Sequence, residues 1–277
     1  MKKKMILPVL ILLLLAAALT FCTLRLLAHE QAQNEELDRI ESLAGEVSAL
    51  SGRLAALEQQ LGDFADDYKR DQEYFRYGHQ WGNGFNWLAL GNSLTLIQAY
   101  GHGVASTRPD NDYFALVQAY LAAKHEEVDA FRYNFVLWEQ AENRSSKLYV
   151  IDSFLSPAID LVTLQLGENA ADLSAYQEDL AFLIRHIQEA CPHARVIVVD
   201  DFWDEAKSAL RRAAADETGA AFADLAAIRG EKEYQSAEGT VFFLADGSQK
   251  TVTKEAETHP GDEGMAAIAE KIIALLE

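Results

Sequence analysis

Short apolar runs alternate with longer segments of helical periodicity from residue 87 to the C-terminus. Runs of this length indicate strands buried on both faces, and such strands belong to parallel sheets covered by helices. The alternation therefore predicts one α/β domain with helices on both sides of a parallel sheet. The expected strands are Trp87–Leu90, Tyr133–Leu137, Ile159–Leu166, Ala194–Val199 and Ala221–Leu225.

Helical patterns fill much of the sequence between these runs. One segment, Glu231–Glu257, interrupts the order, because two strand-like runs there flank Asp246-Gly247. Asp-Gly between two such runs is typical of a tight β-hairpin, so we expect a hairpin of Thr240–Leu244 and Gln249–Thr253. The expected helices include Asp172–Ala190, Asp204–Thr218 and Asp262–Leu276.

The N-terminus has the pattern of a membrane-targeting segment. Lys2, Lys3 and Lys4 precede a mostly apolar run, residues 5–24, that is long enough to span a bilayer. Lysines at this end place the N-terminus in the cytoplasm. We therefore expect residues 1–28 to be a cytoplasmic tip and an uncleaved, single-pass signal anchor, with the C-terminal domain extracellular. Cleavage within residues 1–28, which would release a secreted protein, is the alternative.

A heptad repeat follows the apolar run. Ile and Val at early a positions, with Leu at d, favour a parallel two-stranded coiled coil. Three glycines oppose it, since each weakens a helix by about 1 kcal/mol relative to alanine. We expect a stalk over residues 29–70 that forms a parallel homodimer through residues 36–68; a lone stalk, or a helix packed on its own domain, is the alternative. The a residues are Ile40, Val47, Leu54, Leu61 and Tyr68, and the d residues are Leu43, Leu50, Leu57 and Phe64.

The charge and cysteine content exclude several classes of function. The formal net charge is −19, and the acidic excess lies after residue 28, because the basic Lys2–Lys4 and Arg25 precede it. Such a surface repels nucleic acid, so no nucleic-acid partner is expected. Cys22 lies in the apolar run, which leaves Cys191 alone in the rest of the chain. We therefore expect no internal disulfide, no cysteine-based metal site and no cofactor.

The stretch from Trp87 to Thr95 carries the first candidate for chemistry. Apolar residues stop at Gly91-Asn92-Ser93, and a helix-compatible segment follows. This pattern predicts a buried strand, a sharp turn, and Ser93 at the start of the next helix. Open α/β sheets place nucleophiles and bind anions at this carboxyl edge. Ser93 is therefore a candidate nucleophile.

Three further motifs lie where a strand ends or a helix begins. Gly103 follows His102 in a glycine-flanked bend that could point an N–H group outward, or be an ordinary loop. Asn169 follows the strand that ends near Leu166, and it could donate to an oxyanion or form a helix cap. His259 lies just before a proline that begins the last helix, where it could be a base or a structural residue.

Together, Gly91-Asn92-Ser93-Leu94, Gly103, Gly167-Glu168-Asn169 and His259-Pro260 resemble the ordered blocks of the GDSL/SGNH hydrolase superfamily, here of a membrane-anchored bacterial type. The resemblance covers about residues 85 to 277, and it implies a three-layer α/β/α, flavodoxin-like fold. It also implies Ser93 as nucleophile and His259 as general base and acid. The oxyanion donors it implies are the Ser93 and Gly103 backbone N–H groups and the Asn169 side chain.

The sequence departs from the family pattern next to His259. The family usually has an aspartate three residues before this histidine, and Ala256 stands there instead. Glu255 and Glu257 are the nearby carboxylates that could orient the imidazole; a backbone carbonyl is the other possibility. A Ser-His dyad is therefore expected in place of a triad.

The resemblance implies an extracytoplasmic serine esterase in residues 71–277 that hydrolyses small acyl esters, O-acetyl groups above all. The substrate that it implies is a small acyl ester or an acetylated carbohydrate. An O-acyltransferase with the same site is one alternative, and a non-catalytic surface module for scaffolding or binding is the other. The residues themselves do not separate a hydrolase from a transferase.

Overall fold

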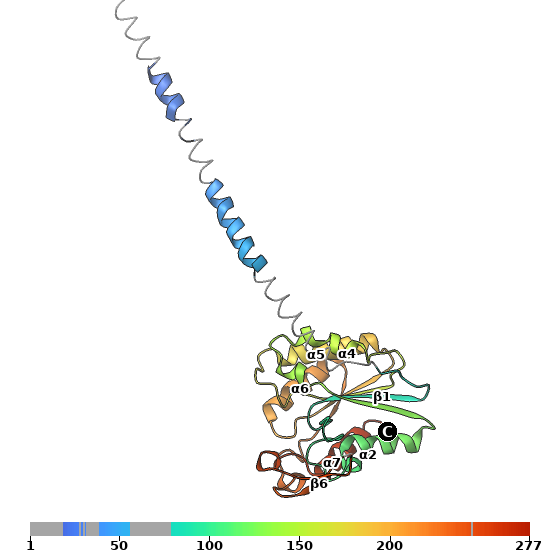
Figure 1. Ribbon diagram of the computed structural model, residues 1–277. Coiled ribbons are helices and arrows are strands. Elements are labelled where there is room, and N and C mark those ends of the chain that lie inside the picture. The colour runs from blue at the N-terminus through green and yellow to red at the C-terminus, as the bar shows by residue number, and fades with distance from the viewer. Residues whose placement is uncertain (1–18, 28, 30, 32–38, 56–78, 245) are drawn as a thin grey trace, which may run out of the picture. The chain divides into compact units, whose positions relative to one another are not determined.

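The computed structural model describes residues 19–27, 29, 31, 39–55, 79–244 and 246–277. The chain divides into two units, residues 1–70 and residues 71–277, which are described separately. In the first unit, residues 19–27 and 39–55 are helical (Figure 1). Much of the predicted anchor lies outside the described residues, as do the heptads after residue 55. None of the helices that are described is long and apolar enough to cross a membrane.

The described part of the predicted stalk presents its apolar stripe to solvent. All five heptad-core side chains within residues 39–55 are more than half exposed. A helix with one apolar stripe gains stability when that stripe packs against another surface. The exposed residues are Ile40, Leu43, Val47, Leu50 and Leu54.

Five parallel strands form the central sheet of the second unit, within the described residues, in the order β2-β1-β3-β4-β5. Each neighbouring pair runs parallel. This agrees with the predicted parallel sheet. β1 lies next to the edge strand β2, at the point where the chain reverses its direction across the sheet. The strands are β1 (Phe85–Gly91), β2 (Val128–Asn134), β3 (Leu161–Gln165), β4 (Arg195–Val199) and β5 (Ala221–Ala223).

Helices cover both faces of this sheet, as Figure 1 shows. The helices are α2 (Tyr113–Lys124), α3 (Val136–Gln140), α4 (Tyr149–Asp152), α5 (Tyr176–Ala190), α6 (Glu205–Thr218) and α7 (Asp262–Ile273). Short 3-10 helices are η2 (Pro109–Asn111), η3 (Arg144–Lys147), η4 (Lys232–Tyr234) and η5 (Lys254–Ala256). The predicted hairpin is confirmed as β6 (Val241–Phe243) paired antiparallel with β7 (Gln249–Thr251).

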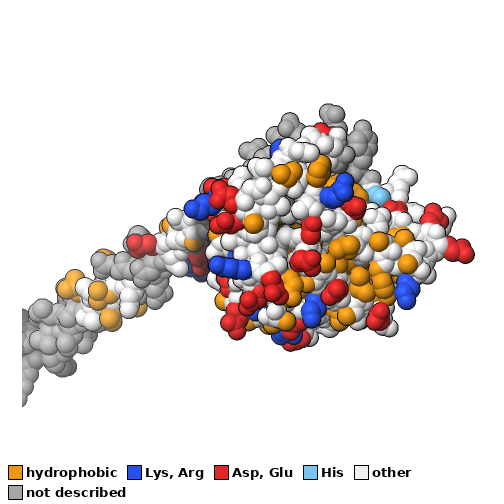
Figure 2. Space-filling view, turned by 90° about the horizontal axis from the view of Figure 1, so that it is seen from below, with side chains coloured by type: hydrophobic (Ala, Val, Ile, Leu, Met, Phe, Trp, Pro, Cys, Tyr) orange, Lys and Arg blue, Asp and Glu red, His pale blue; other side chains and the backbone are white. Residues whose placement is uncertain are grey.

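Alternation along β1 gives the domain two cores. Leu88 and Leu90 face the core covered by α3, α4, α5 and α6, whereas Trp87 and Ala89 face the core covered by α2 and α7. Because every residue of β1 after Phe85 is buried, the end of this strand is held from both sides. Figure 2 views the α2, α7 and β6 side and shows acidic side chains spread over that face.

One predicted strand is wrong in position. Tyr133–Leu137 was expected to be a strand, but β2 ends at Asn134 and α3 begins at Val136. The edge strand β2 is only partly buried along its whole length, so it tolerates Asp129 and Arg132 and lacks an apolar run. The apolar residues that follow instead enter the core as a short helix.

Candidate active site

Ser93 lies in a tight turn at the carboxyl end of β1. The Leu96 N–H donates to the Asn92 carbonyl oxygen at 2.9 Å, and the Leu94 N–H donates to Asn92 Oδ1 at 3.1 Å. A Cβ atom at Gly91 would meet Thr95 Oγ1 at 1.7 Å, so the turn requires glycine there. Ser93 is half-buried, and its own N–H has no acceptor among the described residues. That N–H is therefore free to bind an anion.

The helix predicted after Ser93 does not form. A single turn is followed by irregular chain, and the next α-helix, α2, begins only at Tyr113. Arg132 on β2 explains part of this path, because its guanidinium donates to the carbonyl oxygens of Thr95, at 3.4 Å, and Gly101. These bonds hold the irregular chain between Thr95 and Gly101 against Arg132.

The Gly103 N–H does not point outward toward a substrate, as one interpretation of the sequence had it. It donates to Asp112 Oδ2 at 3.0 Å, inside the protein, and not toward an open site. Asp112 is fully buried, caps α2 through Ala115, and also pairs with Arg132. A Cβ at Gly103 would meet the Leu94 carbonyl oxygen at 2.1 Å. In this structure Gly103 thus packs against the Ser93 turn and is not a free oxyanion donor.

Asn169 lies in the loop after β3, and it shares a hydrogen-bond partner with Asn92, the residue before Ser93. Its Nδ2 donates to Glu139 Oε2 at 2.6 Å, while Asn92 Nδ2 donates to Glu139 Oε1 at 3.0 Å. Gly167 begins this loop with a positive φ of 122°, and its N–H also donates to Glu139. Asn92, which precedes Ser93, and Asn169 are therefore joined through one carboxylate.

Glu139 is a residue that the sequence analysis missed. It lies near the end of α3 and is 1% exposed. The signal in the sequence was an acidic residue directly after the apolar run Phe135–Trp138. An acid that an apolar helix carries into the core needs internal donors, and it receives them here from the Ser93 and Asn169 loops.

His259 lies between η5 and α7, as its place before Pro260 predicted. Its Nδ1 is 3.2 Å from the Ala256 carbonyl oxygen, and its ring packs edge-on against Trp203 with the centroids 5.3 Å apart. Because a carbonyl oxygen can only accept, Nδ1 carries the proton and Nε2 is left with its lone pair. Burial lowers the pKa of His259, although the Ala256 bond and the negative charge of Glu168 oppose the shift. The imidazole is therefore neutral at neutral pH.

Glu255 and Glu257 do not orient His259. Glu255 is exposed and Glu257 is half-exposed, and neither carboxylate bonds to the imidazole among the described residues. The segment before His259 forms the 3-10 helix η5. The group that contacts the imidazole is instead the Ala256 carbonyl oxygen.

The structure brings Ser93, Asn169 and His259 to the same edge of the sheet, where β1 and β3 end and α7 begins. The negative charge of Glu168, in the Asn169 loop, acts on His259, and Glu168 Oε2 accepts from Asn92 beside Ser93. In the residues that the structure describes, the Ser93 hydroxyl makes no hydrogen bond to His259. Nor do those residues include three or more His, Cys, Asp or Glu side chains placed to hold a metal ion.

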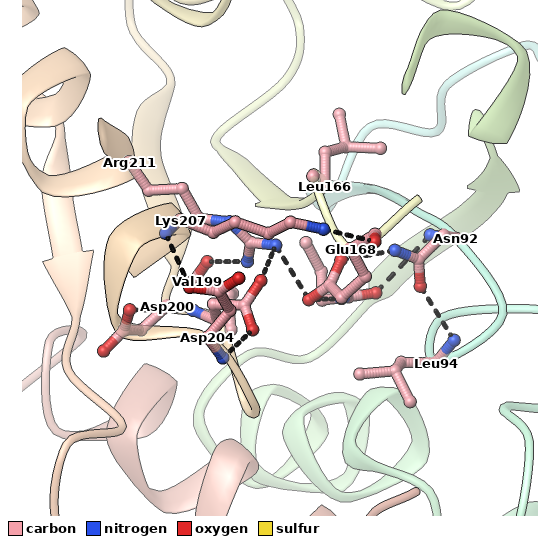
Figure 3. Close-up of polar contacts among 12 residues, drawn as sticks. Asn92, Leu94, Leu166, Glu168, Val199, Asp200, Asp204, Lys207 and Arg211 are labelled. Carbon is pink, nitrogen blue, oxygen red and sulfur yellow. Dashed lines mark hydrogen bonds and ion pairs between the residues drawn. The ribbon is translucent and has the colours of Figure 1, made fainter. Parts of the chain in front are cut away.

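A buried charge network lies beneath this edge (Figure 3). Arg211 of α6 is fully buried; its Nη2 is 2.9 Å from Glu168 Oε1 and 2.9 Å from Asp201 Oδ2. The Lys207 amine donates to the Glu168 carbonyl oxygen at 2.6 Å. Burial raises the pKa of Asp201, although Arg211 opposes the shift. The loop that carries Asn169 is thus fastened to α6 as well as to α3.

Glu139 makes the stability of the fold depend on pH. Burial, and then the charge of Glu168, raise its pKa from 4.5 to about 7. A group whose pKa is raised by folding stabilises the fold below its unfolded pKa and loses that contribution as pH rises through the folded pKa. His259, whose pKa is lowered, has the opposite sign and loses its contribution as pH falls below 6.5.

This pH dependence can be tested by comparing the wild type with Glu139→Gln. The variant leaves His259 unchanged and removes only the titration of Glu139. We expect the free energy of unfolding of the wild type, relative to the variant, to fall by on the order of 1–3 kcal/mol between about pH 5 and pH 8. Urea denaturation followed by tryptophan fluorescence measures it. A difference that stays constant over this range contradicts the assignment of the raised pKa to Glu139.

Comparisons with known proteins give structural neighbours only. No protein-family model matches the chain, and no curated protein matches it either. Among solved structures, a phospholipase A1 from Streptomyces albidoflavus is 15% identical with a TM-score of 0.45, over 69% of this chain and 99% of that one. A catalytic mutant of an acetylxylan esterase from Geobacillus stearothermophilus is 15% identical with a TM-score of 0.48, over 71% and 95%.

A two-domain esterase active on acetylated mannans is 17% identical with a TM-score of 0.47, over 69% of this chain and 48% of that one. These neighbours are esterases and lipases. Similarity at this level does not assign an activity to the present chain, so its function has to be inferred from the site itself.

Proposed function

We propose that the chain is an extracytoplasmic serine esterase of the SGNH type that hydrolyses small acyl esters through Ser93 and His259. One observation carries the proposal: the Ser93 turn and the Asn169 loop are joined by hydrogen bonds at the carboxyl edge of the sheet, and the unoccupied Ser93 N–H lies there. Chemistry at this edge is what an open α/β sheet provides.

In the proposed reaction, His259 Nε2 removes the proton from the Ser93 hydroxyl as Ser93 Oγ attacks the ester carbonyl carbon. The lowered pKa of His259 keeps its imidazole in the neutral form that a base requires. The bond from Nδ1 to Ala256 orients the ring, and the charge of Glu168 favours the imidazolium that forms. His259 then gives the proton to the leaving alcohol, and water releases the acyl group in a second, equivalent cycle.

The tetrahedral intermediate places negative charge on the former carbonyl oxygen. The Ser93 N–H and the second Nδ2 hydrogen of Asn169 are the proposed donors for this oxyanion. Gly103, the third donor that the family resemblance implies, would contribute only if its N–H exchanged Asp112 for the substrate. Preorganised donors of this kind supply a large share of catalysis in acyl transfer.

The substrate class that we propose is the ester of a neutral, hydroxyl-rich alcohol, such as an acetylated carbohydrate, and a cavity with a mixed polar and apolar lining could receive part of it. This cavity has a volume of about 440 Å³ and lies beside Glu139, between α3 and the start of α5. Its lining includes the polar side chains of Gln140, Glu142, Arg144 and Asp172 beside three alanines. This mixture of charges and apolar groups would accept a neutral substrate.

Acetate release tests the proposal and separates it from an O-acyltransferase. The purified protein is incubated with an acetylated neutral oligosaccharide, with and without a free sugar acceptor, and both acetate and acetylated acceptor are measured. The esterase hypothesis predicts acetate release that does not need the acceptor. Acetylation of the acceptor with little acetate release supports the transferase instead.

A non-catalytic surface module for scaffolding or binding remains the second candidate. Two observations favour it: His259 lacks a carboxylate partner, and its imidazole is not hydrogen-bonded to Ser93 among the described residues. Absence of any ester hydrolysis by folded protein would support this candidate.

The proposed location is the outer side of the cell membrane, with residues 5–24 as the anchor. If residues 1–28 are cleaved, the protein would be secreted. The stalk is proposed to form a parallel homodimer through residues 36–68. The exposed apolar stripe of residues 39–55 supports this, because a second copy of the same helix would cover it.

Substitution of Leu50 by aspartate should weaken that dimer. Leu50 is 60% exposed in the isolated helix and occupies a d position, so the change would bury two charges at the seam. Sedimentation of residues 29–277 should show a concentration-dependent dimer whose dissociation constant rises at least about tenfold in Leu50→Asp. Ser48→Asp, at an exposed b position of the same helix, should leave the dimer intact. A wild-type monomer at high micromolar concentration contradicts the proposal.

A further inference from the structure

One buried carboxylate has no assigned role in the proposed reaction. Glu139 accepts hydrogen bonds from three groups that belong to two separate loops: Asn92 Nδ2 at 3.0 Å, Asn169 Nδ2 at 2.6 Å, and the Gly167 N–H. The first loop follows β1 and the second follows β3. Through these bonds Glu139 joins both loops to α3.

The geometry of the two amides makes these contacts specific. An amide nitrogen has two hydrogens. One hydrogen of Asn169 goes to Glu139, which leaves the other to point at a substrate oxygen. Both hydrogens of Asn92 are taken, one by Glu139 and one by Glu168, while Asn92 Oδ1 accepts from Leu94. The turn that carries Ser93 is therefore fixed on both sides of that residue.

We infer that Glu139 is a positioning residue of the proposed hydrolytic site, which holds the Asn169 amide and the Ser93 turn in register with one another. The inference rests on the proposed function. Glu139 does not touch the reacting atoms; it acts through Asn92 and Asn169. Active sites lose rate when such supporting contacts are removed, because the donors must be held within fractions of an ångström.

The role requires the charged form of Glu139. Protonation would place a hydrogen on an oxygen that now accepts from an N–H group, so the hydrogen bonds to the three groups would be weakened. Burial and Glu168 raise the pKa of Glu139 to about 7, which places this change near neutral pH. The charged and titratable groups that face Glu139 are Glu168 in the β3 loop, Arg144 of η3 and Tyr176 of α5. Glu168 in turn interacts with Arg211 and Lys207 of α6 and with His259, and Arg211 pairs with Asp201 after β4.

The first experiment measures kcat and KM for hydrolysis of p-nitrophenyl acetate as a function of pH. Glu139→Gln should lower kcat about 100-fold, as loss of an oxyanion donor does, and change KM by less than about threefold. The wild-type profile should rise through two ionisations, one of His259 and one near pH 7, and Glu139→Gln should lose the second. Glu139→Asp, which keeps the charge on a shorter chain, should restore that ionisation and part of kcat.

Glu189→Gln is the matched control, since Glu189 is an exposed carboxylate near the end of α5 and lines neither the proposed site nor the cavity beside Glu139. Its kcat should stay within about twofold of the wild type, as is usual for surface changes. A folded Glu139→Gln variant with wild-type kcat and an unchanged pH profile overturns the inference. A loss in kcat that leaves both ionisations in place also overturns it, because the effect would then be merely structural.

A second measurement needs neither activity nor a variant that folds. In protein labelled with ¹⁵N-glycine, the Gly167 amide resonance should titrate with a midpoint near 7, because its N–H donates to Glu139. A Gly167 resonance that does not move near neutral pH overturns the inference. If Ser93→Ala is as active as the wild type, the proposed function fails, and the glycine titration still decides whether Glu139 holds the loop.

Discussion

Ser93→Ala is expected to abolish ester hydrolysis, with kcat/KM for p-nitrophenyl acetate reduced by about 10⁴-fold or more. Alanine has no hydroxyl to attack the carbonyl, whereas the Ser93 N–H and the Asn169 amide remain. Any residual rate would reflect those donors and substrate binding alone. The turn itself should survive, because its hydrogen bonds come from Asn92 and Leu96 and do not use the serine side chain.

The matched control for this change is Ser51→Ala, an exposed serine in the helix of residues 39–55. It should keep wild-type kcat and KM. His259→Ala should cause a loss similar to that of Ser93→Ala, and the double variant should lose little more, since the two residues act as one unit. Activity within a few fold of the wild type in Ser93→Ala contradicts the assignment of the nucleophile.

Arg211→Met is expected to be the most destabilising substitution, with a loss of about 3–5 kcal/mol in the free energy of unfolding. Arg211 is 0% exposed and pairs with both Glu168 and Asp201. Methionine fills much of the same volume but removes the Arg211 counter-charge from the buried Asp201 and the partly buried Glu168. For a domain of this size the melting temperature should fall by roughly 10 °C or more.

Arg212→Met, at the next position of α6, is the control. Arg212 pairs with Asp224, and both side chains are nearly half exposed, so the change should cost less than about 1 kcal/mol. Melting followed by near-UV circular dichroism measures both variants. The cost of Arg211→Met should shrink at low pH as the raised pKa of Asp201 lets that carboxyl become neutral. Equal stability of the two variants contradicts the importance of the buried network.

The strands and helices with continuous burial could be predicted from the sequence. β1, β3 and β4 are apolar because both faces of the sheet are covered, and α5 and α6 show a helical period because one face of each is covered. These patterns follow from which side chains are buried. The edge strand β2 could not be found this way, because partial exposure lets it carry charged residues.

The position of His259 before a helix could be predicted, but its partner could not. The bond from its Nδ1 goes to the Ala256 carbonyl oxygen, and a backbone group leaves no trace in the choice of residue. The candidate carboxylates, Glu255 and Glu257, lie close in sequence, but neither bonds to the imidazole in the described structure. Proximity in the sequence therefore could not decide between these carboxylates and the backbone carbonyl that was the other possibility.

Long-range contacts account for the remaining misses. The Gly103 N–H is taken by Asp112 through a loop closure that nothing in the glycine pattern indicated. Glu139 acquires its role only because β1 lies next to both β2 and β3, which brings Asn92, α3 and Asn169 together. The sequence identified the loops that carry chemistry, whereas the tertiary contacts determine which atoms in them are free.

The most direct test of the central claim is active-site labelling with a fluorophosphonate, followed by peptide mass spectrometry of the folded protein. The account predicts a single covalent adduct on Ser93, absent in Ser93→Ala and strongly reduced in His259→Ala. Folded protein that remains unlabelled, or labelling that is equal in the wild type and Ser93→Ala, would contradict it.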